Sequence, residues 1–454
     1  MKITDIQVIP FTLRRRSFHN GELLPETTIT QTLTKILTDE GAEGYYFGGS
    51  GHGDMDGMSP EQAAILTGHL KNLVLGHDPF DREKFWHWMW TAHRIPENIM
   101  SVLDMALWDL QARLFNLPLY KLLGGCRDKV KAYASTYPNM GSPQDYADHA
   151  KACQREGYTH YKIHPYYFWD PQTGQPDPGR PSHIKQDIEV CSLVRDAVGR
   201  DMVLSYDPWG TYRTYEEAYK VGRILEELDF YWYEHPMPEY RVAPYEKLCR
   251  ELSIPILSPE IVEGSIYSRA DWILRGASDM TRIDVLRGGV TGVKKMAAIA
   301  EAYSIKCEIH MSGFANLQLL GSTSEDVCEY YERGLLAPGI DCNEVPPYLD
   351  ALGDQRRRRG PKLRMGAWRP VSAFRRRYTM RPLSKSYGLI SIFTISPTVI
   401  LMKCLRSLPE MCASTTCSFA NLTLNIVPGS TSTPASRTSR WASPAEFSAK
   451  GCAR

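Results

Sequence analysis

The sequence lacks a short-spaced cysteine framework, a secretory leader and a long apolar run. Its eleven cysteines are scattered through 454 residues, and a chain of this size can bury a core without disulfide staples. The start, MKITDIQVIPFTL, alternates like a strand rather than joining a basic segment to an apolar one. The longest apolar run, 389–402, has 14 residues, whereas a spanning helix needs roughly 20. We therefore expect a cytoplasmic protein that does not span a membrane.

Acidic residues are almost missing from one part of the chain. Residues 355–454 hold 18 Lys and Arg but only two acids, Glu410 and Glu446. This segment has a net charge of +16, so residues 1–354 carry −15 of the overall +1. Because it lacks regular periodicity, we interpret it as disordered, or as translation of a shifted frame or an intron. The alternative is a basic tail that binds nucleic acid through 356–359, but the segment contains no recognisable nucleic-acid-binding motif.

The rest of the chain predicts two domains. Residues 1–125 combine alternating runs with helical periodicity, which indicates an α+β domain. Residues 126–354 contain eight short β-like runs separated by amphipathic helical stretches, which predicts parallel strands and a closed α/β barrel. A doubly wound open sheet is the alternative. An insertion rich in aromatics and proline, 165–181, follows the second run and should overhang the mouth of the barrel.

Side chains that can do chemistry recur at one point of each strand-like run. The second run ends in a lysine and a histidine, and later runs end in acids or histidine: Lys162, His164, Asp207, Glu234, Glu260, Asp284, His310 and, within the eighth, Glu329. From Asp207 on, the gaps are 27, 26, 24, 26 and 19 residues, close to one strand and helix unit. We therefore expect these side chains at the C-terminal rim of the barrel, where active sites lie.

Three of these acids predict a metal site. Asp207, Glu234 and Glu260 come from neighbouring strands and would repel one another unless a cation or protons neutralised them. Ligation by oxygen alone, with positions left for water or substrate, suits Mg²⁺ better than Zn²⁺. His235, the residue after Glu234, should point to the opposite face of its strand and serve the structure.

The remaining groups predict acid and base chemistry. Lys162 and His164 are two residues apart and therefore face the same side. His310 lies across the barrel, where Asp284 can bond its second ring nitrogen and fix its tautomer. Bases on two sides of a metal indicate removal of a proton α to a carboxylate.

The motifs SYDPWG, WYEHP, SPE, IDV and EIH, with the helix at 104–125, resemble the enolase superfamily, in its mandelate racemase and muconate-lactonising branch. The resemblance covers roughly residues 1–350 and implies an α+β capping domain over a modified TIM barrel, (β/α)7β. It also implies Mg²⁺ on the three acids and a His310–Asp284 acid/base pair. Glu329 matches the family's acid on the eighth strand. Substrate contacts are assigned to His19 and His52, whose loops match mobile capping loops, and to Trp209.

One departure bears on the reaction. Where related sequences carry Lys-x-Lys, this chain has Lys162-Ile163-His164, which leaves open which group on that face is the base. We expect dehydration of an aldonic or aldaric acid to a 2-keto-3-deoxy acid. Racemisation, epimerisation or cycloisomerisation of a hydroxy acid is the alternative, as is an impaired enzyme whose basic tail binds nucleic acid. The expected partners are a small carboxylate and, by resemblance, further copies of the chain in a symmetric homo-oligomer.

Overall fold

The computed structural model describes residues 1–19, 21–49, 57–92, 95–166, 169–170, 175–176, 183–311, 313–341 and 363–364. The chain divides into two units, 1–373 and 374–454, and every described residue belongs to the first. Of the basic segment 355–454, only residues 363–364 are among the described residues.

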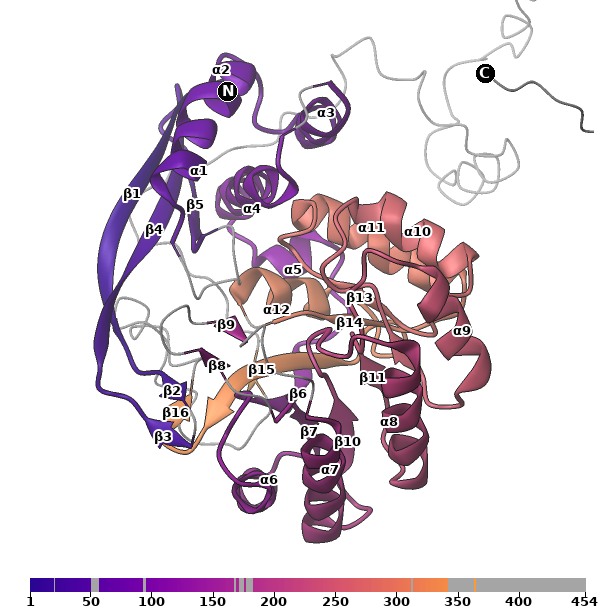
Figure 1. The fold of residues 1–454 in the computed structure, drawn as a ribbon. Coiled ribbons are helices and arrows are strands. Elements are labelled where there is room, and N and C mark those ends of the chain that lie inside the picture. Colours follow the sequence, from indigo (N-terminus) through magenta and orange to yellow (C-terminus); the bar gives the residue numbers. More distant parts are fainter. Residues whose placement is uncertain are drawn as a thin grey trace, which may run out of the picture. The chain divides into compact units, whose positions relative to one another are not determined.

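The N-terminal domain is built on an antiparallel sheet with one long helix, α4 (Glu97–Leu114), packed on it (Figure 1). In sheet order the strands are β1 (Ile3–Arg15), β4 (Thr27–Thr38) and β5 (Glu43–Phe47). Gly44 permits the close approach of α4, because a Cβ there would lie 2.2 Å from the Ala106 carbonyl oxygen. The shorter elements are β2 (Phe18–His19), β3 (Glu22–Leu23), α1 (Pro60–Ala64), η2 (Ile65–Leu70), α2 (Lys71–Val74), α3 (Arg82–His87), η3 (Trp88–Ala92) and α5 (Leu119–Leu122).

Eight parallel strands within the described residues form a closed barrel. Six of them lie in one sheet, and the other two form a parallel pair that is joined to it by the bridges Leu257–Met280 and Cys307–Cys328. The strands are β6 (Lys129–Thr136), β7 (His160–Ile163), β10 (Val203–Tyr206), β11 (Tyr233–Glu234), β12 (Ile256–Leu257), β13 (Thr281–Ile283), β14 (Cys307–Ile309) and β15 (Tyr330–Ala337). Because β15 also pairs with β6, the sheet closes on itself. The predicted barrel is confirmed, and the open sheet is wrong.

Helices follow the first seven barrel strands, which gives the (β/α)7β order in the described part of the chain. They are α6 (Pro143–Arg155), α7 (Ile184–Val198), α8 (Tyr215–Glu227), α9 (Ala243–Glu251), α10 (Ser265–Leu274), α11 (Gly289–Ala302) and α12 (Phe314–Gly321). Capping boxes begin α6 at Ser142 and α8 at Thr214. None of the helices in the described ranges has the length and apolar character needed to cross a bilayer.

Four short strands complete the structure. β8 (Trp169–Asp170) pairs with β9 (Gln175–Pro176) inside the 165–181 insertion, most of which lies outside the described residues. β16 (Ile340–Asp341) pairs antiparallel with β15. β17 (Leu363–Arg364) pairs antiparallel with β6, so these two residues of the expected tail contact the barrel.

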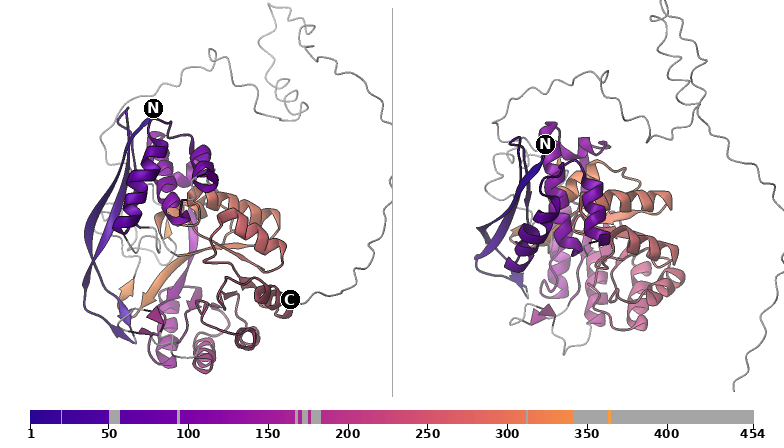
Figure 2. Two further views of the ribbon diagram at one scale, coloured as in Figure 1. Left: turned by 45° about the horizontal axis from the view of Figure 1, so that its top comes forward. Right: turned by 90° about the horizontal axis from the view of Figure 1, so that it is seen from above.

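The N-terminal domain and the barrel share a hydrophobic core. Leu103 and Leu107 of α4 belong to the same buried cluster as Val290 and Val293 of α11. The further views in Figure 2 show the N-terminal domain lying along one side of the barrel. The capping domain is therefore packed directly against the helix that follows β13.

Candidate active site

The predicted acids and bases gather where the barrel strands end. Lys162 lies within β7, Glu234 ends β11, and the other members directly follow or closely follow their strands: His164, Asp207, Glu260, Asp284 and His310. Because parallel strands end at one rim of a barrel, these side chains reach a common space. The acids among them are buried, with relative exposures of 5% or less.

Lys162 lies at the centre of a buried cluster of charges. Its Nζ atom is 3.2 Å from Asp207 Oδ2, 3.0 Å from Glu234 Oε2 and 2.8 Å from Glu332 Oε1. Burial alone would lower the pKa of Lys162, but the charges of Glu234 and Glu332 raise it well above its usual value. A cation therefore already lies between carboxylates that three barrel strands, β10, β11 and β15, supply.

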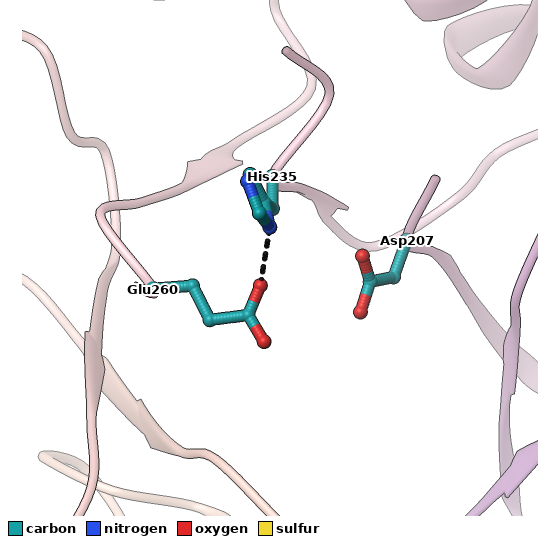
Figure 3. A group of neighbouring side chains, drawn as sticks. All are labelled: Asp207, His235 and Glu260. Carbon is teal, nitrogen blue, oxygen red and sulfur yellow. Dashed lines mark hydrogen bonds and ion pairs between the residues drawn. The ribbon is translucent and has the colours of Figure 1, made fainter. Parts of the chain in front are cut away.

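Three residues of this end could together hold a metal ion. Donor atoms of Asp207, His235 and Glu260 all lie within 4.8 Å of one another, and Figure 3 shows the two carboxylates facing each other beside the imidazole. His235 Nδ1 lies 2.6 Å from Glu260 Oε2. The chain thus has a possible metal site that contains two of the three predicted acids.

His235 lies in this cluster because the backbone turns after β11. Its φ angle of 40° ends the strand alternation from which we expected it to face away, so that expectation is wrong. Glu234 instead pairs with Lys162, and its Oε1 lies 2.7 Å from Arg282 Nε. Burial raises the pKa of Glu234 to about 7, against the lowering effect of Arg282 and Lys162.

His310 and Asp284 form the predicted pair. His310 Nδ1 donates to Asp284 Oδ2 at 2.8 Å, and its Nε2 lies 2.8 Å from Glu260 Oε1. Burial lowers the pKa of His310, but the charge of Glu260 and the bonds to both acids raise it to about 10. Asn316 holds the two loops together, since its Nδ2 donates to the His310 carbonyl and its Oδ1 accepts from Val285 N.

His164 has a fixed ring orientation on the other side of the site. Its Nδ1 lies 2.6 Å from the Thr136 carbonyl oxygen, which can only accept, so Nδ1 carries a proton. Its Nε2 lies 3.2 Å from Asp207 Oδ2. Trp209 contacts the His164 ring edge to face at 4.8 Å between centroids, and its backbone N–H donates to Asp207. Trp209 therefore borders the site, and its contact with substrate stays a prediction.

Glu329 does not join these residues. It precedes β15, at the opposite end of the strand, where it pairs with Lys306 and accepts from Tyr231. Glu332 reaches the site instead, with contacts to Lys162 and Arg282. The prediction placed Glu329 within the eighth strand, but β15 begins at Tyr330, so Glu329 lies before the strand. Of the two predicted histidines in the capping loops, the side chain of His19 and all of His52 lie outside the described residues.

Three buried residues of the site, Arg282, Glu332 and Glu239, were not predicted from the sequence. Arg282 is fully buried, and its Nη2 donates to Glu332 Oε2 at 2.5 Å and to the Tyr133 hydroxyl at 3.1 Å. Strand alternation could have found both, because Arg282 lies two residues before Asp284, and Glu332 two after the inward-facing Tyr330. Glu239 accepts the backbone N–H of Glu260 at 2.7 Å.

Comparisons with known proteins agree with this geometry. A family model described as the N-terminal domain of mandelate racemase / muconate lactonizing enzyme matches residues 24–124, and an enolase C-terminal domain-like model matches 145–346. The chain is 27% identical to L-talarate/galactarate dehydratase of Salmonella typhimurium over 307 residues, which is 66% of this chain and 72% of that protein. It is 31% identical to D-gluconate dehydratase of Thermoproteus tenax over 249 residues, 52% of this chain and 48% of that protein.

Among solved structures, D-glucarate dehydratase from Agrobacterium tumefaciens, complexed with magnesium, superposes with a TM-score of 0.68 and 33% identity. The match covers 77% of this chain and 90% of that protein. A capped α/β barrel with titratable side chains at its C-terminal rim is the architecture of an enzyme. The chain belongs to the enolase superfamily, in the group of mandelate racemase and muconate lactonizing enzyme.

Proposed function

We propose that the chain dehydrates an acid sugar, an aldonate or aldarate, to a 2-keto-3-deoxy acid. The observation that carries this proposal is the pair of oriented imidazoles, one fixed by Thr136 and the other by Asp284, with the buried carboxylates between their strands. Dehydratases of acid sugars are among its relatives, including those that act on talarate, galactarate and gluconate.

Mg²⁺ fits the donors of this site. The proposed ligands are Asp207, Glu234 and Glu260, with the His235 imidazole as a further donor beside Glu260. The fit is supported by Lys162, whose ammonium already lies within 3.2 Å of Asp207 and Glu234, so these oxygens accept a cation. When bound, the ion supplies positive charge that stabilises the enediolate of the substrate.

The two imidazoles have different roles in this proposal. His164 carries its proton on Nδ1, so Nε2 is the atom that takes the α-proton, and Asp207 stabilises the imidazolium that forms. Lys162 is held by three carboxylates and keeps its proton. His310, protonated beside Asp284, donates from Nε2 to the β-hydroxyl, which leaves as water, and the enol then tautomerises to the keto acid.

Proton exchange tests these roles separately. We would incubate the protein with Mg²⁺ and a pool of aldonates and aldarates in D₂O, and follow α-proton exchange and new keto acids by NMR. His310→Asn should keep exchange and lose dehydration, whereas His164→Asn should lose both. Chelation and Glu234→Gln should abolish all signals. Turnover that survives in His310→Asn would contradict the proposal, and loss of exchange in His310→Asn but not in His164→Asn would reverse the two roles.

Racemisation or epimerisation is the second candidate, because each side of the site presents an imidazole that could exchange the α-proton. A relative named D-galactarolactone cycloisomerase, 25% identical over 310 residues, also adds cycloisomerisation to the alternatives. The same NMR experiment separates these reactions when lactones of the aldarates are added to the pool. Exchange with inversion and without a keto acid would favour racemisation or epimerisation, and loss of a lactone ring would favour cycloisomerisation.

A further inference from the structure

The capping domain reaches the loop that carries Asp284. Helix α11, which follows this loop, starts at Gly289 and has no side-chain cap of its own. The first N–H groups of a helix lack partners within the helix and need acceptors from elsewhere. Here the acceptors come from helix α4, 187 residues earlier in the sequence.

Two side chains of α4 provide them. Ser101 Oγ accepts the backbone N–H groups of Gly288 and Gly289, both at 2.9 Å. Asp104 Oδ2 accepts the N–H of Thr291 at 2.9 Å, and its Oδ1 accepts the Thr291 hydroxyl at 2.5 Å. A carboxylate at this position also meets the positive end of the helix dipole. The start of α11 is thus fixed by another domain.

Two tryptophans of the capping domain strengthen the same contact. Trp86 Nε1 donates to the Gly288 carbonyl at 2.9 Å, and Trp108 Nε1 donates to the Thr291 hydroxyl oxygen at 2.9 Å. The approach is close enough to require glycine, because a Cβ on Gly289 would lie 2.2 Å from Asp104 Oδ2. The polar contact is therefore specific and leaves little room for movement.

The fixed helix start is continuous with the acid/base pair. Asp284 Oδ1 accepts the N–H of Leu286 at 2.9 Å, and the Asp284 carbonyl accepts the N–H of Arg287 at 2.8 Å. Asp284 Oδ2 in turn accepts from His310 Nδ1. Four residues separate Asp284 from Gly289 in one tight turn, so a shift of the helix start moves the carboxylate that orients His310.

We propose that Ser101 and Asp104 are positioning residues that hold the Asp284–His310 pair in its working geometry through the N-terminus of α11. The inference assigns the capping domain a role in aligning the acid/base pair. It depends on the geometry of the pair and not on which substrate is converted, although its kinetic readout rests on the proposed function.

The test compares two buried aspartates of α4. Asp104 contacts the barrel, whereas Asp109 accepts the backbone N–H of Tyr45 within the capping domain. In protein labelled with ¹⁵N-histidine, the His310 Nδ1–H signal is assigned by its absence in His310→Asn. Asp104→Ala should shift or broaden this signal, and Asp104→Asn, which keeps an acceptor for Thr291, should restore it. Asp109→Ala should leave the signal in place.

Kinetics give a second readout on the same variants. Asp104→Ala should lower kcat about 10- to 100-fold with little change in KM, because a small misplacement of a reacting group carries a cost of this size. A folded Asp104→Ala protein with an unchanged His310 signal would overturn the proposal, as would an equal change in Asp109→Ala. If Asp104→Ala does not fold, Ser101→Ala decides, and an unchanged signal in that variant would also overturn it. The NMR readout needs no substrate, so failure of the proposed dehydration leaves this test intact.

Discussion

The two ends of the barrel hold lysine–glutamate pairs in very different surroundings. At the C-terminal end, Lys162 is 1% exposed and lies within 3.2 Å of three carboxylates. At the N-terminal end, the Lys306 side chain is 36% exposed and pairs with Glu329. Burying several charges costs solvation free energy, and a core can be stabilised by apolar side chains without that cost. An exposed ion pair contributes little to the free energy of unfolding. The contrast indicates that the buried charges serve chemistry.

Buried glutamates show the same contrast. Glu332 is buried at the C-terminal end, and although burial raises its pKa, the charges of Lys162 and Arg282 hold it well below its usual value. Glu308 lies in β14 toward the other end and accepts backbone N–H groups of Glu329 and Tyr330. Burial raises its pKa to about 8. Glu332 is thus kept ionised at one end, whereas burial favours the protonated form of Glu308 at the other.

Removing the central cation should have the largest effect. Lys162→Met leaves Asp207, Glu234 and Glu332 buried without this partner, and we expect the free energy of unfolding in chelator to fall by about 3–5 kcal/mol. Urea unfolding followed by tryptophan fluorescence measures this change. Lys306→Met, the matched variant at the other end, should cost no more than about 1 kcal/mol. Equal losses would remove the contrast between the two ends.

The next largest effect is expected when the two candidate acids of the eighth strand region, Glu332 and Glu329, are replaced one at a time. Glu332→Gln weakens contacts to Lys162 and Arg282 and to the Met311 N–H, and we expect turnover to fall about 10²- to 10³-fold. Glu329→Gln should leave turnover within about twofold, since its contacts lie at the other end of the strand. Rates of keto-acid formation decide the matter, and a loss confined to Glu329→Gln would restore the sequence-based assignment.

The barrel and most of its rim could be predicted from the sequence. Period-2 runs, helical stretches and a repeat of about 25 residues define one strand and helix unit after another, and this repeat placed Asp207, Glu260, Asp284 and His310 at the same end of the barrel. The pairing of His310 with Asp284 could also be predicted, because the two residues follow neighbouring strands.

The errors arose where a strand starts or where its alternation stops. Glu329 and Glu332 both lie in the run DVCEYYE, and the observed start at Tyr330 decides which one reaches the rim. His235 was assigned to the wrong face because its positive φ follows a two-residue strand. Contacts between distant segments, such as Asp104 with Thr291, leave no local pattern in a single sequence.

The pH dependence of stability would sharpen the contrast between the acids. A folded-state pKa of about 8 for Glu308 lies above the ordinary glutamate value, so the folded protein holds a proton that the unfolded chain releases. Stability contributed in this way is present below about pH 4.5 and is lost as pH rises toward 8, by up to about 1.4 kcal/mol per pH unit. Glu308→Gln should flatten this slope in urea unfolding between pH 5 and 8, and exposed Glu301→Gln should not. The assignment would be contradicted if the free energy of unfolding of the wild type rose with pH over this range, as in Glu301→Gln, and if Glu308→Gln had the same slope.

The smallest expected effect concerns the choice of ion at the C-terminal end. His235 places a nitrogen donor beside the carboxylates of Asp207 and Glu260, and imidazole favours Mn²⁺ and later transition metals relative to Mg²⁺. His235→Gln should therefore weaken Mn²⁺ binding about tenfold, the size usual for loss of a group next to a metal ligand, while Mg²⁺ binding changes less. Titration of the metal-free protein, with free Mn²⁺ followed by electron paramagnetic resonance, measures both affinities by competition.

His149→Gln is the control for that titration, because His149 lies on α6 and bonds to the Tyr161 hydroxyl, away from the acids. Pulsed measurements on bound Mn²⁺ add a direct criterion, since a coordinated imidazole gives a nitrogen coupling that should vanish in His235→Gln and persist in His149→Gln. Tight Mn²⁺ binding without this coupling in the wild type would show that His235 acts on Glu260 alone. The C-terminal end would then depend on oxygen donors, as the sequence pattern of Asp207, Glu234 and Glu260 first indicated.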